Sequence, residues 1–135
     1  MPKVKQVNHV AVVVDDMEKA ISFWRDALGM ELHELRDVPA EKSQVAFLPL
    51  PGSEVELVKP TTDDSGIAKY LARRGPGMHH IAIAVKDIRA SLAELKNKGA
   101  RLIDETPRVG AGGCLVAFVH PSSINGVLLE LVQHQ

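Results

Sequence analysis

The chain has 135 residues, of which 45% are hydrophobic and 24% charged, with a formal net charge of −1; this is typical of one globular domain over residues 1–135 and excludes a disordered chain. A charge this close to zero provides no overall positive field, so we expect neither nucleic acid nor a membrane surface as a partner. The single cysteine, Cys114, excludes an intramolecular disulfide, and the N-terminus has no signal-peptide pattern, so we expect a cytoplasmic protein.

The beginning of the chain predicts a strand followed by an amphipathic helix. The short, valine-rich stretch 6–14 is typical of a buried strand, and one of the two aspartates after it is expected to cap the helix. Apolar residues then recur at helical spacing, namely Met17, Ala20, Ile21, Trp24 and Leu28. The sequence therefore predicts a helix over 17–28, with Phe23 and Trp24 in the core and Gly29 as the residue that ends it.

Three further strands complete the first half of the chain. Apolar stretches over 30–38, 44–50 and 54–58 predict them, and residues 51–53, Pro-Gly-Ser, have the composition of a hairpin turn. The polar stretch 39–43 is predicted to be a loop.

A linker over 60–65 and a short helix over 67–73 precede a second series of elements. This series is expected to contain a strand, a helix and three short strands, at 78–85, 87–98, 101–103, 114–119 and 127–132. The glycine-rich stretch 108–113 is predicted to be a turn; it lacks the lysine and the following Ser or Thr of a phosphate-binding loop.

The two halves are copies of one module when they are compared at an offset of 71 residues. His9 and its successors, HVAVVVDD, fall on His80 and its successors, HIAIAVKD. The last strand of each half contains an apolar-Glu-apolar-apolar tetrad, which is VELV around Glu56 and LELV around Glu130. A repeat of this length indicates two supersecondary units that share one core.

The repeat predicts an α+β fold built from tandem βαβββ modules, one over about 5–60 and one over about 76–135. Each helix is expected to cover one face of its own strands. Two such modules then form a curved eight-stranded mixed sheet around a metal-binding cleft.

The metal-binding site is predicted from four polar residues that recur inside the apolar strands. They are His9, Glu56, His80 and Glu130. An unpaired buried carboxylate costs several kcal/mol even after relaxation, and two in one cleft would repel each other. A divalent cation removes this cost, and imidazole with carboxylate suits zinc, cobalt, nickel, iron or manganese better than calcium or magnesium.

Each of these residues has a simpler interpretation when it is taken alone. A histidine in a strand is usually a hydrogen-bonded structural residue, and a glutamate in a strand usually faces solvent. The recurrence of both in both halves favours the metal site. We expect His79 to point to the other face from His80 and Cys114 to serve packing, and His134 lies in the tail without a counterpart in the first half.

With these residues in place, the chain resembles the vicinal oxygen chelate (glyoxalase/bleomycin resistance/dioxygenase) superfamily and, within it, the methylmalonyl-CoA epimerase family. Four segments carry the resemblance over essentially the whole chain: NHVAVVVDDMEKAISFWRDALGMEL, EVELVKPTTDDSGIAKYLARRGPGMHHIAIAV, RLIDETPRVGAGG and FVHPSSINGVLLELVQ. The second and fourth are the specific ones, because the first is shared with many relatives of other function.

The resemblance implies an isomerase that moves a proton on C2 of the acyl-CoA substrate methylmalonyl-CoA through a metal-stabilised enolate. It implies four metal ligands, His9, Glu56, His80 and Glu130, with glutamine in place of Glu56 in some relatives. It implies cobalt as the metal, with manganese, nickel or zinc accepted, and a homodimer. Glu130 is then one acid/base of the reaction.

Inversion of C2 also needs an acid/base on the opposite face of the substrate. Relatives with a two-glutamate mechanism carry it on the third strand, where this chain reads QVAFL without a carboxylate. Glu41, in the preceding loop, is the nearest carboxylate and our candidate, with Gln44 acting through water or another group as alternatives.

Three other functions fit the same fold. A glyoxalase I-like lactoylglutathione lyase uses four such ligands on a glutathione hemithioacetal. A ring-cleaving dioxygenase uses two histidines and one glutamate, leaving open iron positions, so Glu56 as a fourth ligand argues against it. A metabolite-binding module generally lacks the metal set.

Overall fold

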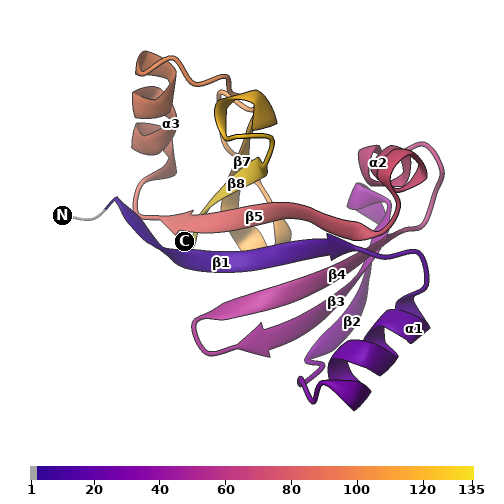
Figure 1. Cartoon of the computed structure of the whole chain (residues 1–135). Coiled ribbons are helices and arrows are strands. Elements are labelled where there is room, and N and C mark those ends of the chain that lie inside the picture. Colours follow the sequence, from indigo (N-terminus) through magenta and orange to yellow (C-terminus); the bar gives the residue numbers. More distant parts are fainter. Residues whose placement is uncertain (1–2) are drawn as a thin grey trace. The chain divides into compact units, whose positions relative to one another are not determined.

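The computed structural model describes residues 3–135 and has the predicted α+β composition (Figure 1). Its contacts divide the chain into two compact units, one comprising Val10–His79 and the other comprising the chain up to His9 together with His80–Gln135. The division passes through two strands, β1 (Val4–Val13) and β5 (Gly77–Val85). Each of these strands therefore contributes residues to both units.

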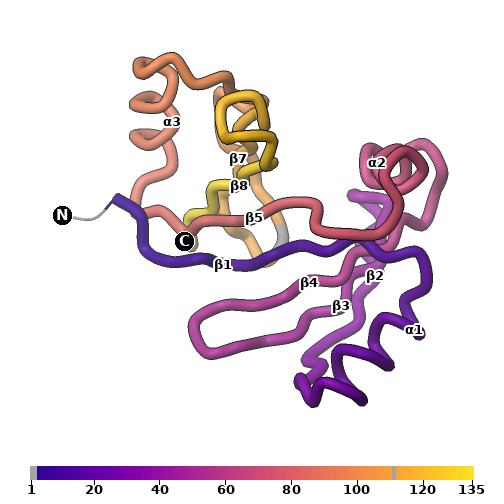
Figure 2. The backbone as a smooth tube through the Cα atoms, viewed as in Figure 1, coloured from indigo at the N-terminus to yellow at the C-terminus, as the bar shows by residue number. Residues whose placement is uncertain are grey.

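The unit Val10–His79 contains the end of β1 and three strands of its own, which are β2 (Glu34–Val38), β3 (Ser43–Leu50) and β4 (Ser53–Pro60). Strand β4 pairs with β1 in parallel and with β3 in antiparallel orientation, and β3 pairs with β2. The tight turn from β3 to β4, which Figure 2 shows, contains Gly52 at φ +74°. This confirms the predicted hairpin at 51–53.

The helices of this unit are α1 (Met17–Ile21), continued by a π-helix over Ser22–Ala27, and α2 (Gly66–Arg74). Met17 and Ile21 of α1 are buried against Ala46, Leu48 and Leu57 of β3 and β4. Because residues 46 and 48 of β3 share one face, α1 covers that face, as the helical spacing predicts.

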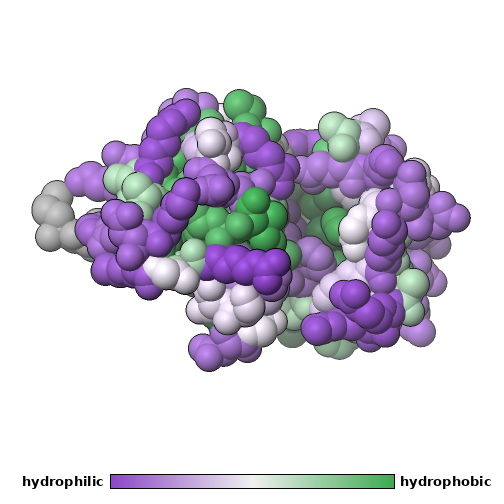
Figure 3. Space-filling view, turned by 90° about the horizontal axis from the view of Figure 1, so that it is seen from above, coloured by the Kyte–Doolittle hydropathy of each residue, from purple (hydrophilic) through white to green (hydrophobic). Residues whose placement is uncertain are grey.

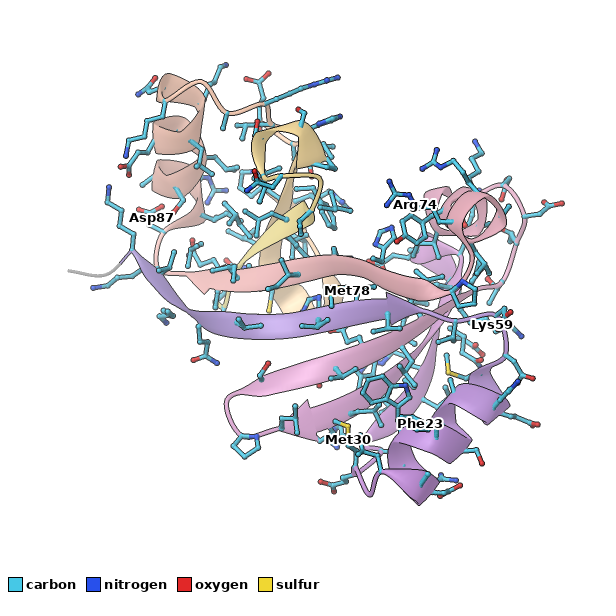
Figure 4. All side chains as sticks on the ribbon, in the orientation of Figure 1. Phe23, Met30, Lys59, Arg74, Met78 and Asp87 are labelled. Atoms are coloured by element: carbon cyan, nitrogen blue, oxygen red, sulfur yellow. The ribbon has the colours of Figure 1, made fainter. Side chains whose placement is uncertain are left out.

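The end of the predicted helix differs from the expectation. Phe23 and Leu28 are each 57% exposed, not buried, whereas Trp24 packs against the core with Met30; Figure 4 labels Phe23 and Met30. The N–H of Leu28 donates to the carbonyl of Phe23 at 2.8 Å, which is an i→i+5 bond. Such a turn takes up one more residue than an α-turn, so it rotates Leu28 off the 3.6-residue face. Phe23 does not belong to the apolar spacing of the helix, and its predicted place in the core is wrong.

The second unit contains β5 together with β6 (Arg108–Val109), β7 (Leu115–Val119) and β8 (Leu128–Gln133). Strand β8 pairs with β5 in parallel and with β7 in antiparallel orientation. The helix α3 (Ile88–Asn97) buries Ile88 and Leu92 against Leu115, Ala117 and Leu131. Each βαβββ module therefore has its own helix-covered core, as predicted.

The hydrogen-bonded neighbours of the described strands follow the order β2-β3-β4-β1-β5-β8-β7-β6. This confirms a mixed sheet of eight strands. The face shown in Figure 3 is covered largely by hydrophilic residues. No helix in residues 3–135 is long and apolar enough to cross a membrane.

Two predicted strands are shorter than expected. Residues 101–103 form only a single bridge, Leu102 to Val119, because the Asp104 carboxylate accepts a hydrogen bond from the N–H of Phe118 at 2.8 Å and takes the place of a strand partner. The stretch 30–38 is a strand only over Glu34–Val38. The turn predicted at 108–113 is wrong at its start, because Arg108 and Val109 pair with Val116 and Leu115 and form β6.

The repeat is visible in the strand register as well as in the sequence. Glu56 on β4 lies opposite Ala11 and Phe47, and Glu130 on β8 lies opposite Ala82 and Phe118. The alanine pair and the phenylalanine pair each have the 71-residue offset of the repeat. The two glutamates therefore occupy equivalent places in their own modules.

The helix starts are equivalent too, and they offer a test of local stability. Asp87, at the start of α3 in Figure 4, accepts a hydrogen bond from the N–H of Ala90 at 3.1 Å, and Asp16 does the same for α1. Replacing Asp87 by alanine leaves that N–H without its cap, so the free energy of unfolding should fall by about 1 kcal/mol.

Urea unfolding followed by circular dichroism measures this change. Asp87→Asn is the matched control, because asparagine caps about as well as aspartate. An alanine variant as stable as the wild type would contradict the capping role.

Candidate metal centre

Two histidines face each other across β1 and β5 in the unit that contains both. The N–H of Lys86 donates to the carbonyl of Lys3 at 3.0 Å, which joins the two strands. His9 lies six residues after Lys3, and His80 lies six residues before Lys86. Because the strands run in opposite directions (Figure 1), this register brings His9 and His80 together.

The carboxylate of Glu130 reaches the same point from β8. Glu130 lies opposite Ala82, and residues 80 and 82 of β5 share one face of the sheet. His80 Nε2 lies 3.0 Å from Glu130 Oε1, and His9 Nε2 lies 3.4 Å from the same oxygen. The two Nε2 atoms are 3.2 Å apart. Three donor atoms from three strands thus converge.

This geometry fits a divalent transition metal. Ligand atoms about 2.1 Å from a metal lie roughly 3.0 Å apart at a right angle and roughly 3.4 Å apart at the tetrahedral angle. The three observed separations fall in that range. Two imidazoles with one carboxylate are ligands that zinc, cobalt, nickel, iron and manganese accept.

The cluster is buried, and its neighbours hold the rings in place. The side chains of His9, His80 and Glu130 are 8%, 12% and 10% exposed. The ring of Phe118 stands perpendicular to that of His80, with centroids 5.5 Å apart. Asn8 Oδ1 lies 2.7 Å from His9 Nδ1, the ring nitrogen that faces away from the cluster. Such outer contacts orient the donor atoms before a metal binds.

The pKa of the Glu130 carboxyl reflects two opposing effects. Burial raises it, but hydrogen bonds from His80 and His9 and the positive charge of both rings lower it to about 2. The carboxyl is therefore ionised at neutral pH, as a metal ligand must be.

The structure brings three of the five predicted site residues together. Among residues 3–135, the cluster of potential metal ligands comprises His9, His80 and Glu130. Glu56 lies half-buried on β4 of the other unit, so its part in the site stays a prediction. Glu41 is exposed in a 3-10 turn before β3, and its role as the second acid/base is likewise untested.

Sequence reasoning missed the residue next to the first histidine. Its counterpart in the second half is not an asparagine but His79, which packs against Tyr70 with ring centroids 4.7 Å apart, so the repeat gave no signal for Asn8. Cys114 packs against a core cluster, as predicted, and its Sγ also lies 3.2 Å from His134 Nδ1.

Comparisons with known proteins find relatives over nearly the whole chain. The family described as Glyoxalase/Bleomycin resistance protein/Dioxygenase superfamily matches residues 8–118. The mitochondrial methylmalonyl-CoA epimerase of Mus musculus is 41% identical over 132 residues, which are 97% of this chain and 74% of that protein. The ethylmalonyl-CoA/methylmalonyl-CoA epimerase of Cereibacter sphaeroides is 40% identical over 95% of this chain and 97% of that protein.

A solved structure agrees with these relatives. The crystal structure of methylmalonyl-CoA epimerase from Mycobacterium tuberculosis matches with a TM-score of 0.91 at 34% identity, covering 100% of this chain and 91% of that chain. The resemblance inferred from the four sequence segments is thereby confirmed.

The lowered pKa of Glu130 predicts how acid affects the metal-free protein. Folding lowers this pKa from 4.5 to about 2, so folding favours the ionised carboxylate. The resulting stabilisation is fully present above pH 4.5 and is lost as the pH falls through 4.5 toward 2. Glu130→Gln removes it, and the loss of stability across this window should be smaller in the variant by on the order of 1 to 3 kcal/mol.

Urea unfolding of the chelator-treated protein across that pH window measures the difference. The matched control is Glu31→Gln, which removes one exposed carboxylate. Parallel pH profiles for the wild type and Glu130→Gln would show that the two imidazoles do not hold the carboxylate.

Proposed function

The chain belongs to the Glyoxalase/Bleomycin resistance protein/Dioxygenase superfamily, and from this premise we propose that it is a metal-dependent methylmalonyl-CoA epimerase. One observation carries the proposal: His9, His80 and Glu130 converge with metal-ligand spacing in a chain that is similar to such epimerases over nearly its full length. The reaction inverts C2 of the substrate by moving one proton.

We assign the metal to His9, His80 and Glu130, with Glu56 as a fourth ligand and cobalt as the native ion. The equivalent register of Glu56 and Glu130, each between an alanine and a phenylalanine of its own module, supports the fourth ligand. A divalent ion there would supply Lewis-acid stabilisation of the charge that develops on the substrate oxygens when C2 is deprotonated.

The chain itself moves the proton. C2 lies between a thioester carbonyl and a carboxylate, so its C–H bond is the acidic one. Both histidine contacts of Glu130 involve Oε1, which leaves Oε2 as the oxygen that accepts the proton. A second group must return a proton on the opposite face, and Glu41 is our candidate for it.

The homodimer and the cytoplasmic location are proposals from the sequence. Light scattering coupled to size-exclusion chromatography tests the first, and localisation of the tagged protein in its own cell tests the second.

Proton exchange at C2 tests the activity directly. With cobalt, manganese, nickel or zinc added, the protein should transfer solvent deuterium into C2 of methylmalonyl-CoA, measured by mass spectrometry. Glu130→Gln removes the base and should lower the exchange rate by at least about a hundredfold. No exchange with any of these metals would refute the proposal, and turnover of methylglyoxal with glutathione would indicate the lyase instead.

The two acid/base roles can be separated in the same assay. Glu41→Gln should still exchange deuterium into one epimer through Glu130 while inversion, followed by chiral analysis of the product, is lost. Loss of both exchange and inversion, or full retention of both, would show that Glu41 is not the second acid/base.

The role of Glu56 is tested by metal content. Because some relatives have glutamine at this position, Glu56→Gln should keep near-stoichiometric metal, whereas Glu56→Ala removes the donor oxygen and should weaken metal binding about 10- to 100-fold. Plasma emission analysis after dialysis measures the difference. Equal metal in the wild type and Glu56→Ala would remove Glu56 from the ligand set.

A further inference from the structure

A line of hydrogen-bonded side chains leads away from the candidate metal centre to the C-terminus. Asn8 Oδ1 lies 2.7 Å from His9 Nδ1, and Asn8 Nδ2 lies 2.9 Å from His134 Nε2. His134 Nδ1 in turn lies 3.2 Å from Cys114 Sγ. All four residues belong to the same compact unit.

The sheet register fixes the far end of this line. Leu115 of β7 lies opposite Gln133 of β8, so one further step along this antiparallel pair brings Cys114 opposite His134. The side-chain N–H of Gln135 donates to the carbonyl of Gly113 at 2.7 Å and holds the end of the chain beside the same strand. His134, which directly follows the strand that carries Glu130, is therefore anchored beside the start of β7.

Metal binding at His9 determines which ring nitrogen carries the proton in each histidine of this hydrogen-bonded series. A metal held by His9 Nε2 requires the ring proton on Nδ1, so that N–H donates to Asn8 Oδ1. Asn8 then turns its amide N–H₂ toward His134 and donates to Nε2. His134 must carry its proton on Nδ1, which donates to Cys114 Sγ. The four groups thus form one directed set without a conflicting donor or acceptor.

We propose that Asn8 and His134 are positioning residues that hold His9 ready to bind the metal. Asn8 fixes the tautomer and the ring orientation of His9, and His134 fixes the orientation of the Asn8 amide. This inference rests on the metal centre of the proposed function. It assigns a task to a residue that the repeat does not mark, because His79, the counterpart of Asn8, packs against Tyr70.

Metal affinity, and not only activity, tests the proposal. Cobalt binding to the full-length apoprotein is measured by competition with a chromophoric chelator, and the visible absorption of the bound cobalt reports its ligand geometry. Asn8→Ala should weaken cobalt binding about 10- to 100-fold, as removal of an outer hydrogen-bond partner of a ligand typically does, and should change the visible bands.

Three further variants separate positioning from folding. Asn8→Asp keeps the oxygen acceptor and should bind cobalt within about threefold of the wild type. His134→Ala should weaken binding by about three- to tenfold, and in the Asn8→Ala background it should add nothing, because His134 acts through Asn8. Asn97→Ala, an exposed position at the end of α3, is the matched control for an Asn→Ala change.

The outcomes distinguish this inference from the proposed function. A wild-type protein that does not bind cobalt would refute the metal centre itself. If the wild type binds cobalt and Asn8→Ala binds it with the same affinity and the same visible spectrum, only the positioning role is overturned. An Asn8→Asp variant as weak as Asn8→Ala, or additive effects of Asn8→Ala and His134→Ala, would also overturn it.

Discussion

The buried carboxylate of Glu130 is the constraint on which the rest of the structure depends. It lies in an apolar strand with its side chain 10% exposed, where an ionised group without a partner costs several kcal/mol. The fold meets that cost by bringing two imidazoles within 3.0 and 3.4 Å of one carboxylate oxygen. Two imidazoles and a carboxylate are in turn a set of ligands that favours a cation at their centre. The strand register that brings β1, β5 and β8 together is therefore also the register that makes a metal centre.

The repeat explains how so few residues build this site. Each module places its glutamate between an alanine and a phenylalanine, opposite the strand that carries the histidine of that module. The shared register means that one local folding pattern, used twice, places a histidine and a glutamate at equivalent positions of each module. The two modules then diverge around the histidines. Asn8 precedes the first and hydrogen-bonds its ring, whereas His79 precedes the second and packs against an aromatic ring. The repeat therefore accounts for the positions of the histidines and glutamates, whereas the residues before the two histidines, Asn8 and His79, differ and contact their surroundings differently.

Hydrophobic periodicity and the repeat were enough to predict seven of the eight described strands, the core faces of α1 and α3 and the three residues of the cluster, because a polar residue recurring inside an apolar strand is visible in sequence. Three features were not visible for physical reasons. The π-turn that exposes Leu28 depends on a backbone hydrogen-bond shift that residue spacing does not encode. The side chain of Asp104 replaces a strand partner at Phe118, which removes the strand predicted at 101–103. The contact of His134 with Asn8 joins residues 126 positions apart, and only the sheet register brings them together.

The low pKa of Glu130 bears on the proposal that this one carboxylate is both metal ligand and base. The two histidine rings lower the pKa of Glu130 to about 2 in the metal-free chain, so the carboxyl is ionised at neutral pH but is a weak base there. General-base catalysis is most efficient when the pKa of the base lies near the operating pH. A weak base can remove the C2 proton only if the C2–H bond is made more acidic. Stabilisation of the negative charge that develops on the thioester and carboxylate oxygens has this effect. A site in which the base is weak and the developing anion is strongly held favours exchange of one acidic proton. It does not suit a reaction that needs a strong base acting on an unactivated C–H bond. Proton transfer at a carbon between two carbonyl groups meets this requirement, because its developing negative charge spreads onto oxygens that can be stabilised.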